Sequence, residues 1–423
     1  MHHHQHNKGT VNSRFVIANE VTQSMTSECM DRRSALAMTG KKYGLMATLF
    51  IAAGVWSSGG NAENNIEKKV ITEKVVIASK VSPSAHHSRK ESAKKKRQKP
   101  ISTGPAYAGR TDAMLAATDI AQRRDLDANW VRHTIGQAHY LPQVAKLIEP
   151  AAPGTVKNWQ LYRSRFIDPV RIKAGVKFWQ DNRASLERAE VETGVPAEII
   201  VGILGVETHY GQQMGNFRVI DALTTLTFDF PASHPRALER SAYFKGELEQ
   251  FLSLTQRANM DPLALRGSYA GAMGMAQFMP SSWVKYAIDF DGDSKIDLWS
   301  SPADAIGSVA NYFKTFNWQR GMPTHYPVSF DATRLDLDAL LAPDILPTFS
   351  VASFAAKGAV LEGAALQHQG PLALIELQNG DAAPSYVAGT ENFYTITRYN
   401  WSSYYAMAVI ELGQAVAAAR QPL

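Results

Sequence analysis

Glu207 stands near the end of a long apolar segment, where a carboxyl group can act as a general acid. Residues 196–211 read Pro-Ala-Glu-Ile-Ile-Val-Gly-Ile-Leu-Gly-Val-Glu-Thr-His-Tyr-Gly. At helical spacing Glu207 shares a face with Ile203 and Leu204, which predicts a buried carboxyl group. Burial raises a carboxyl pKa toward the range of roughly 6–7 that general acid catalysis near neutrality needs. The alternative is an ordinary buried glutamate bonded to an arginine or to backbone amides.

A second segment, residues 267–283, combines glycine, alanine and serine with a few polar side chains. So many small residues let a backbone come close to another helix or to an extended ligand. Ser268 and Gln277 can donate or accept hydrogen bonds at such a surface. Tight packing alone is the alternative explanation of the glycines.

Residues 289–299 resemble the start of a calcium-binding loop. Oxygen-bearing side chains stand at loop positions 1, 3, 5 and 9, with an apolar residue at position 8. Glycine falls at position 4 rather than 6, and Ser300 occupies position 12, so Asp304 is expected to supply the missing carboxylate. An Asp-rich turn that holds sodium or water is the alternative. The predicted calcium ligands are Asp289, Asp291, Asp293, Lys295 and Asp304.

Helices are predicted to position these groups. Pro196 suits the first turn of the Glu207 helix, and Gly211 suits its C-terminal cap. Further helical patterns cover residues 170–191, 238–254, 303–316 and 404–420, whereas short β-type pieces at 326–330 and 373–377 lie among Gly and Pro.

The N-terminal region has the composition of an export signal. Lys41 and Lys42 precede an apolar run at 45–56 and then small residues, which predicts a cleaved secretory signal ending at Ala62. Met30 or Met38 is the alternative start, and an uncleaved anchor is the alternative fate. Cys29 lies before the apolar run, so no lipid-anchor cysteine follows it. We therefore expect a soluble exported protein of the periplasm.

Residues 63–105 form a polar, basic segment without apolar periodicity, which is typical of a flexible linker. Its Lys-Lys-Lys-Arg run at 94–97 is interpreted as a solvated tail, with attraction to an anionic envelope surface as the alternative. Nucleic acid is not an expected partner, because no aromatic residues are interleaved with the basic ones.

Four long motifs resemble one known family. They are Gly-Val-Glu-Thr at 205–208, the small-residue segment at 267–282, the acidic loop and following helix through Tyr312, and Asn-Phe-Tyr-Thr-Ile-Thr-Arg-Tyr-Asn at 392–400. Across about residues 106–420 the chain resembles soluble-form members of the membrane-bound lytic transglycosylase B family, glycoside hydrolase family 103.

The resemblance implies a mainly α fold. It has a lysozyme-like (goose-type) helical catalytic core, an additional helical domain and a small β insert. The expected boundaries are an N-terminal extension with the signal (1–62), the linker (63–105) and the transglycosylase domain (106–423). That domain would contain the core at about 170–320, the insert at about 324–384 and a C-terminal helix at 404–420.

The resemblance also implies cleavage of peptidoglycan glycan strands between N-acetylmuramic acid and N-acetylglucosamine. Glu207 would be the sole catalytic acid and base, and the product would be a 1,6-anhydro sugar. Matching positions make the following residues the expected substrate contacts: Tyr162, Ser268, Gln277, Tyr312, Tyr399, Asn400 and Arg240. Glu239 replaces the first residue of the family's arginine pair. Calcium would be structural, the protein a monomer with cell-envelope partners, and membrane contact restricted to an uncleaved signal.

Two other functions stay open. A muramidase that lets water attack needs a second carboxylate about 5–9.5 Å from the acid, and Asp221 and Asp229 are candidates only by sequence proximity. A non-catalytic peptidoglycan-binding protein would carry Glu207 as a structural residue.

Overall fold

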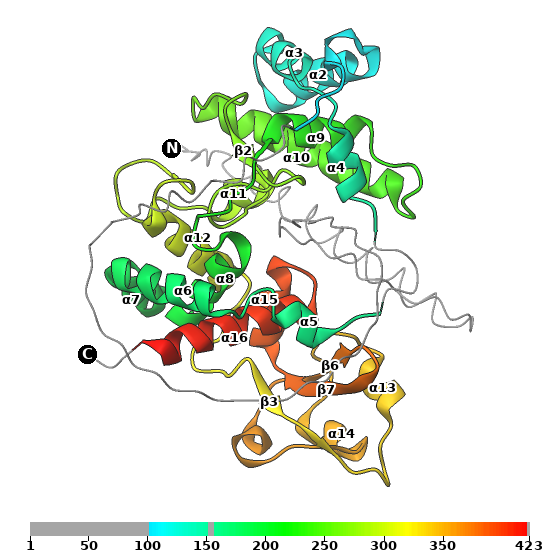
Figure 1. Cartoon of the computed structure of the whole chain (residues 1–423), viewed down its shortest axis with the longest axis vertical. Helices are drawn as coiled ribbons and strands as arrows, with labels where there is room; N and C mark the ends of the chain where they lie inside the picture. Colours follow the sequence, from blue (N-terminus) through cyan, green and yellow to red (C-terminus); the bar gives the residue numbers. More distant parts are fainter. Residues whose placement is uncertain (1–100, 151–155, 421–423) are drawn as a thin grey trace, which may run out of the picture. The chain divides into compact units, whose positions relative to one another are not determined.

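The computed structural model describes residues 101–150 and 156–420, all within one compact unit, Thr48–Leu423 (Figure 1). The predicted signal, its apolar run at 45–56 and the linker up to residue 100 lie outside the described residues. The predicted mainly α fold is confirmed, because most elements are helices and the sheets have two or three strands. None of the described helices is both long and apolar enough to cross a membrane.

One group of helices packs around α10 (Ala237–Arg257), the longest helix described. The 3₁₀ helix η1 (Tyr107–Gly109) begins this group, and a buried Glu249 on α10 accepts hydrogen bonds from Arg123 and Arg124. The other members are α2 (Thr111–Arg124), α3 (Ala128–Gly136), α4 (Pro142–Leu147) and α9 (Val219–Phe228).

A second group of helices surrounds the Glu207 helix. Its members are α5 (Trp159–Arg163), α6 (Pro169–Asp181), α7 (Arg183–Thr193), α8 (Ala197–Thr208), α12 (Pro302–Thr315), α15 (Glu391–Tyr399) and α16 (Ser403–Ala419). Helix α11 (Pro280–Tyr286) packs against both α10 and α12 and so connects the two groups. The pattern at 170–191 is therefore two helices, because the chain leaves the helical conformation at Asn182, the residue between α6 and α7.

Helix α8 is buried on all sides rather than on one face. Every residue from Ile199 to Thr208 is buried, so the helix crosses the centre of the core. Pro196 is its N-cap. The predicted C-cap at Gly211 is wrong, because His209 already adopts the left-handed conformation that ends the helix.

Helices α8 and α16 approach each other through glycines on both helices. A Cβ atom on Gly202 would lie 2.2 Å from the carbonyl oxygen of Val409, and a Cβ atom on Gly413 would lie 2.2 Å from that of Glu198. Real Cβ atoms do not come this close to backbone, so both positions require glycine. The two helix backbones are thus in direct contact along the segment that leads to Glu207.

The β insert follows α12. Strands β3 (His325–Pro327), β7 (Ala382–Gly389) and β6 (Ala373–Asn379) form an antiparallel sheet in that order, and β4 (Ser329–Phe330) pairs with β5 (Ala359–Val360). Helices α13 (Leu337–Leu341), α14 (Val351–Ala356) and the 3₁₀ helix η2 (Gly363–Gln367) connect the strands. The insert has its own hydrophobic cluster, centred on Leu340, Phe354 and Leu374.

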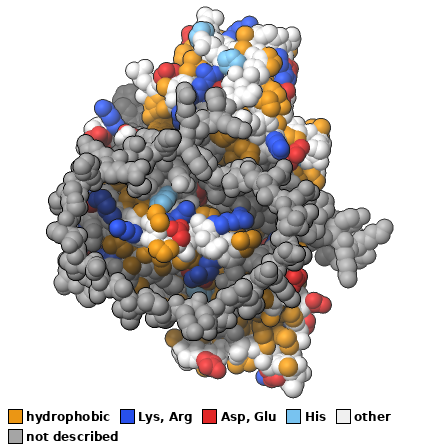
Figure 2. Space-filling view, in the orientation of Figure 1, with side chains coloured by type: hydrophobic (Ala, Val, Ile, Leu, Met, Phe, Trp, Pro, Cys, Tyr) orange, Lys and Arg blue, Asp and Glu red, His pale blue; other side chains and the backbone are white. Residues whose placement is uncertain are grey.

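The visible face of the molecule mixes basic, acidic and apolar side chains among the described residues (Figure 2).

A third antiparallel pair, β1 (Phe217–Arg218) with β2 (Arg266–Gly267), lies at the start of the small-residue segment. This pair fixes where residues 267–283 leave the helical group and enter the core.

We expect Gly202→Ala to lower the free energy of unfolding by about 2–3 kcal/mol, because the added methyl group overlaps the Val409 carbonyl. The measurement is denaturant unfolding. Gly246→Ala on α10 is the matched control, since no described atom outside its helix lies within 4 Å of the added Cβ. The control should be neutral or stabilising by about 0.5–1 kcal/mol. Equal effects at the two positions would contradict the close helix contact.

Candidate active site

The carboxyl group of Glu207 is buried between helices α8 and α16. Glu207 is 8% exposed, and the hydroxyl of Tyr405 donates a 2.6 Å hydrogen bond to its Oε1. Ser402 caps α16 by accepting a hydrogen bond from the Tyr405 backbone amide. The phenol is therefore held in place by the first turn of its own helix as well as by the carboxyl group.

The burial of Glu207 changes its acidity. Desolvation raises the pKa of this carboxyl group from 4.5 to about 7, and the Tyr405 hydrogen bond opposes that rise. Among the described residues no neighbouring carboxylate contributes to the shift. The group is thus protonated in a substantial fraction of molecules near neutral pH, as a general acid must be.

Three tyrosines surround the Glu207 carboxyl group. The pKa values of Tyr162, Tyr399 and Tyr405 are raised, first by burial and then by the nearby Glu207 charge, so all three lie close to it. The Tyr399 and Tyr405 rings are nearly parallel, with centroids 6.4 Å apart. Tyr162 packs on α5 against Trp159. The structure thus gathers two of the predicted substrate contacts, Tyr162 and Tyr399, around the predicted acid.

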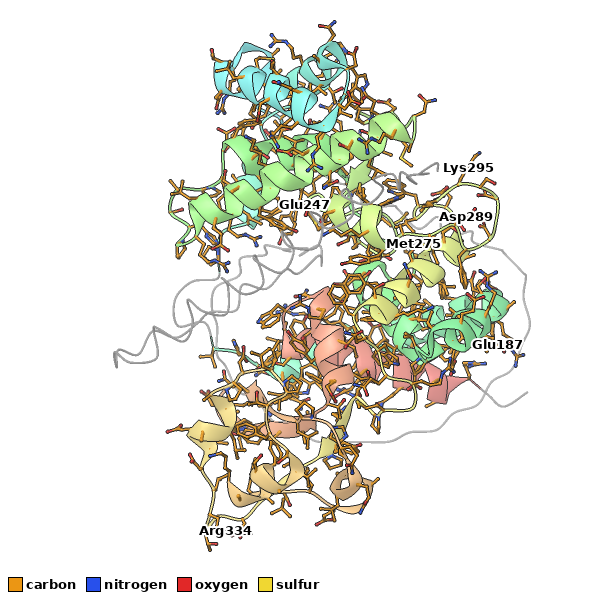
Figure 3. All side chains as sticks on the ribbon, turned by 180° about the vertical axis from the view of Figure 1, so that it is seen from behind. Glu187, Glu247, Met275, Asp289, Lys295 and Arg334 are labelled. Carbon is orange, nitrogen blue, oxygen red and sulfur yellow. The ribbon has the colours of Figure 1, made fainter. Side chains whose placement is uncertain are left out.

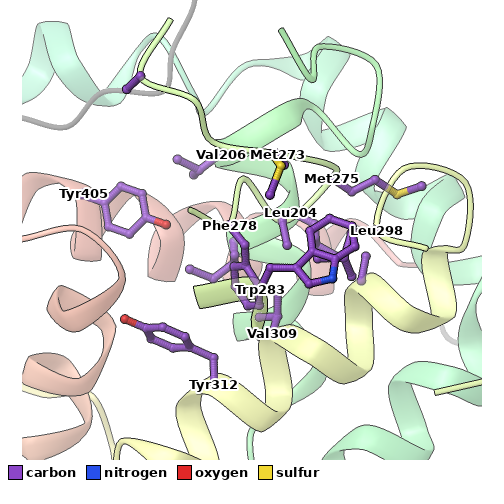
Figure 4. Close-up of a cluster of buried hydrophobic side chains, with 14 of the residues drawn as sticks. Leu204, Val206, Met273, Met275, Phe278, Trp283, Leu298, Val309, Tyr312 and Tyr405 are labelled. Carbon is purple, nitrogen blue, oxygen red and sulfur yellow. The ribbon is translucent and has the colours of Figure 1, made fainter. Parts of the chain in front are cut away.

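Tyr312 extends this aromatic group from helix α12. Its ring centroid lies 4.9 Å from that of Tyr399 and 5.9 Å from that of Phe278. Figure 4 shows Tyr312 and Tyr405 on different helices beside the buried cluster that contains Phe278. The Tyr312 hydroxyl donates to the carbonyl of Arg398, and the Tyr399 hydroxyl donates to that of Ala276. These hydrogen bonds fix the rings, so the aromatic wall is rigid.

Ser268 and Gln277 hold the small-residue segment in shape. The Ser268 hydroxyl accepts hydrogen bonds from the amides of Ala270 and Ala272, at 3.3 and 3.0 Å. The Gln277 side-chain amide donates to the carbonyls of Met214 and Gly274. Both predicted contact residues are therefore buried and bonded to backbone groups. The segment's backbone lies beside the aromatic group, because the Tyr399 hydroxyl donates to its Ala276 carbonyl.

The last two predicted contacts lie in different surroundings. Asn400 follows α15 directly and is 9% exposed. Arg240 on α10 lies over the rings of Tyr243 and Phe244, at 5.4 and 5.2 Å from their centroids, and burial lowers its pKa. Tyr269 of the small-residue segment is among the groups that act on the charge of Arg240 and oppose this lowering.

Asp221 and Asp229, the sequence-based candidates for a second carboxylate, form ion pairs elsewhere. Asp221 pairs with Arg218 at 2.5 Å and accepts from the His139 amide. Asp229 pairs with Arg110 at 2.6 Å. Because arginines already engage both carboxylates, neither is a partner for Glu207 in this arrangement.

The acidic loop, in which Figure 3 labels Asp289 and Lys295, connects α11 to α12. Oxygens of Asp289, Asp291 and Asp293 all lie within 4.8 Å of one another on exposed side chains. Among the described residues Asp304 does not join this group, because its oxygens accept from the amides of Phe290 and Asp297 at 2.7 and 2.8 Å. Lys295 lies in the same loop and has its amide bonded to Asp293.

A chain of hydrogen bonds links the Glu207 helix to this loop. The Thr208 hydroxyl donates to the carbonyl of Met275 at 2.9 Å, and the Met275 amide donates to the carbonyl of Leu298 at 2.7 Å. Thr208 directly follows Glu207. The shape of the acidic loop is thus coupled to the end of the helix that carries the acid.

Sequence reasoning missed Tyr405. It lies 198 residues from Glu207, and its hydrogen bond to that residue depends entirely on how α16 packs against α8. The sequence signal was weak: a pair of adjacent tyrosines, Tyr404 and Tyr405, at the start of the C-terminal helical pattern.

Comparisons with known proteins bear on this site. A family model described as "Transglycosylase SLT domain" matches residues 110–414. The chain is 42% identical over 326 residues to membrane-bound lytic murein transglycosylase B of Escherichia coli (strain K12). The aligned region covers 75% of this chain and 86% of that protein.

Solved structures of lytic transglycosylases are also similar to this chain. The Escherichia coli lytic transglycosylase Slt35 in complex with calcium is 41% identical, with a TM-score of 0.66 over 76% of this chain and 97% of that one. SltB3 from Pseudomonas aeruginosa, in complex with NAG-anhNAM-pentapeptide, is 28% identical, with a TM-score of 0.60 over 73% and 79%.

We expect Glu207→Gln to remove a pH dependence of stability. Because burial raises the pKa in the folded state, the neutral Glu207 side chain leaves the free energy of unfolding at its full value below pH 4.5. As the pH rises to about 7, the buried group ionises and the free energy of unfolding falls. The stability of the variant relative to wild type should therefore increase by roughly 3 kcal/mol between these limits. The measurement is denaturant unfolding across pH.

Tyr405→Phe is the companion variant. This substitution removes a hydrogen bond that favours the charged form of Glu207, so the pKa of the carboxyl group should rise above 7. The loss of unfolding free energy should therefore continue to a higher pH than in the wild type. A difference between wild type and Glu207→Gln that stays constant with pH would show that the carboxyl group titrates normally.

Proposed function

Because this chain belongs to the transglycosylase SLT domain family, we propose that Glu207 is the single acid and base of its reaction. The enzyme is a lytic transglycosylase that acts on peptidoglycan. The observation that supports the role of Glu207 most directly is its burial against Tyr405 with a pKa raised to about 7.

In the first step the protonated Glu207 carboxyl group donates its proton to the glycosidic oxygen between N-acetylmuramic acid and N-acetylglucosamine. The bond from C1 of the muramoyl unit to this oxygen then breaks, and the N-acetylglucosamine end leaves as an alcohol. Desolvation keeps the proton on the carboxyl group at neutral pH until the leaving oxygen takes it.

In the second step the Glu207 carboxylate accepts the proton of the muramoyl 6-hydroxyl as that oxygen forms a bond to C1. The product is a 1,6-anhydro ring, no water is consumed, and the enzyme regains its proton. The Tyr405 hydroxyl steadies the carboxylate between the steps by its 2.6 Å hydrogen bond. The N-acetyl group of the substrate stabilises the positive charge at C1, which removes the need for a second carboxylate.

The tyrosines form one wall of the proposed glycan-binding cleft. Aromatic rings suit sugar faces, and Tyr162, Tyr312 and Tyr399 are fixed by packing or by backbone hydrogen bonds. Ser268 and Gln277 hold the backbone of the small-residue segment, whose amide and carbonyl groups suit N-acetyl groups and hydroxyls. Asn400, which directly follows α15, is assigned to the same substrate through its side-chain amide. Arg240, beside Tyr269, is assigned to a more distant part of the substrate.

The acidic loop is proposed to bind calcium through Asp289, Asp291 and Asp293, with the backbone carbonyl of Lys295 as a further ligand. The set fits the ion, because the three carboxylates converge and calcium prefers oxygen ligands. Asp304 shapes the loop through two backbone amides. The bound ion supplies no chemistry to the reaction and stabilises the loop that supports Met275 and Thr208.

We place the enzyme in the periplasm, where peptidoglycan lies, because of the predicted export signal, which has a basic pair at 41–42, an apolar run at 45–56 and small residues up to Ala62. The proposed partners are glycan strands and proteins of the cell envelope, and the protein is proposed to act as a monomer. We also propose domain limits at 62, 105 and about 324. The expected end of the β insert at about 384 falls inside strand β7, which continues to Gly389, so we propose that the insert ends near residue 389.

Mass analysis of the soluble fragments released from purified murein tests the proposed reaction. Wild-type protein should release fragments one water lighter than hydrolysis products, and Glu207→Gln should lower their rate of release by at least about 10³-fold. Asp221→Asn is the matched control, since its carboxylate is bound to Arg218, and a properly folded variant should keep its activity. Full-mass reducing fragments would identify a hydrolase instead.

Removal of calcium should lower stability more than turnover. Saturating calcium is expected to raise the melting temperature by about 4 °C, the effect on a domain of this size of a ligand at roughly 100 times its Kd. Asp291→Asn should abolish this shift, whereas Asp381→Asn in the exposed β6–β7 turn should keep it. Loss of turnover on chelation with an unchanged melting temperature would assign the ion to the chemistry.

A further inference from the structure

Arg398 lies among three aromatic rings near the C-terminal end of α15, where its side chain is exposed. Its guanidinium carbon lies 5.4 Å from the ring centroid of Phe316 and 5.8 Å from the centroids of Tyr394 and Trp401. All three distances are within the range of cation–π contacts. The rings therefore restrict where the guanidinium group can lie.

Within the described part of the chain Arg398 forms no ion pair. Its side chain donates a 3.3 Å hydrogen bond to the Tyr394 hydroxyl, which is neutral. Arg163, by contrast, pairs with Glu411. A guanidinium group that is held in place but not neutralised keeps N–H donors available, and their planar fork matches the two oxygens of a carboxylate. Arg398 is thus suited to an acidic ligand from outside the chain.

Helix α12 connects Arg398 to the tyrosines around Glu207. The Tyr312 hydroxyl donates to the Arg398 carbonyl at 2.6 Å. The Tyr312 ring centroid lies 4.9 Å from that of Tyr399 and 4.6 Å from that of Phe316. Burial raises the pKa of Tyr312, and the charge of Arg398 opposes this rise, so the guanidinium group itself lies close to Tyr312. Arg398 and Phe316 therefore continue the aromatic wall beyond Tyr312.

The rings around Arg398 are partly open to solvent. Phe316, Tyr394 and Trp401 are half-buried. Tyr286 on α11 is half-buried as well, and its ring centroid lies 5.6 Å from that of Phe316. Apolar ring faces suit sugar rings, and the guanidinium group adds one positive charge to them. This surface therefore suits a sugar that carries a carboxylate better than it suits a neutral one.

We propose that Arg398 binds a carboxylate of a muramoyl unit in the glycan and so favours murein over polymers of N-acetylglucosamine alone. The naming of the glycan rests on the proposed function. A muramoyl unit carries a carboxylate on its own lactyl group or, where that group is amide-linked, on the attached peptide. N-acetylglucosamine carries neither. The carboxylate accepts hydrogen bonds from the guanidinium group while the rings hold the latter in place.

Two substitutions separate the charge of Arg398 from its shape. Arg398→Gln removes the charge, whereas Arg398→Lys keeps the charge and loses the planar fork. Both leave the backbone carbonyl that accepts from Tyr312. Lys314→Gln is the matched control, because Lys314 is an exposed cation on the same helix as Tyr312 and, among the described residues, forms no ion pair.

The experiment measures binding in the Glu207→Gln protein, so that the ligands stay intact. The ligands, of equal chain length, are a murein strand with its peptides, the same strand after an amidase has removed them, and a chito-oligosaccharide without carboxylates. Arg398→Gln should weaken the binding of at least one murein strand by about fivefold or more, with Arg398→Lys between it and the parent. This loss should shrink as the salt concentration rises.

Binding of the chito-oligosaccharide by the Arg398 variants should stay within about twofold of the parent, because it offers no partner for the charge. Lys314→Gln should bind all three ligands as the parent does. Melting temperatures should stay within about 4 °C of the parent, since an exposed cation–π contact contributes little to stability. Loss confined to the peptide-free strand identifies the lactyl carboxylate, and loss confined to the peptide-bearing strand identifies the peptide.

Three results would overturn the proposal. Unchanged binding of both murein strands would show that Arg398 does not contact the ligand. An equal loss with the chito-oligosaccharide would show that Arg398 only supports the rings. An equal loss in Lys314→Gln would show a general effect of surface charge. If the wild type releases no anhydro fragments but the binding pattern holds, the proposed reaction fails and the role of Arg398 stands.

Discussion

The structure depends on the contact between helices α8 and α16. An isolated carboxyl group in a protein core is costly, and here it is stabilised by one phenol rather than by a cation. That arrangement requires the two helices to approach within backbone contact, which Gly202 and Gly413 allow. The same burial that makes Glu207 costly to the fold raises its pKa into the range that the proposed role as general acid needs, so stability and the proposed function oppose each other at this residue.

The tyrosines around Glu207 form a rigid aromatic group. Tyr312 and Tyr399 give their hydroxyls to backbone carbonyls of α15 and of the small-residue segment. Their rings therefore present fixed apolar faces, while water has little access to the carboxyl group. Rigid walls of this kind limit the loss of entropy when a sugar binds, because few side chains have to be ordered.

The small-residue segment transmits the geometry of the acidic loop to the acid. Met275 is bonded on one side to Thr208, next to Glu207, and on the other to Leu298, near the end of the acidic loop. Asp304 fixes that loop from inside through the amides of Phe290 and Asp297. In the arrangement that we propose, a cation at the three exposed aspartates stabilises this connection.

The sequence by itself determined the parts of the protein whose pattern is local. The apolar run before Glu207 predicted a buried acid, and the alternating aspartates predicted an acidic loop. Helical periodicity predicted α10, α12 and α16 and the region of α6 and α7. Local patterns failed where the chain changes direction: His209 rather than Gly211 ends the acid's helix, and Asn182 divides one expected helix into two.

Only the tertiary structure decided which distant residues meet. It brought Tyr405 to Glu207 across 198 residues, engaged Asp221 and Asp229 with arginines, and turned the oxygens of Asp304 toward backbone amides. It also placed Phe316 beside Arg398. Hydrophobic periodicity sets which face of an element is buried, but the partner on that face follows from how helices and strands pack, and no local pattern encodes that packing.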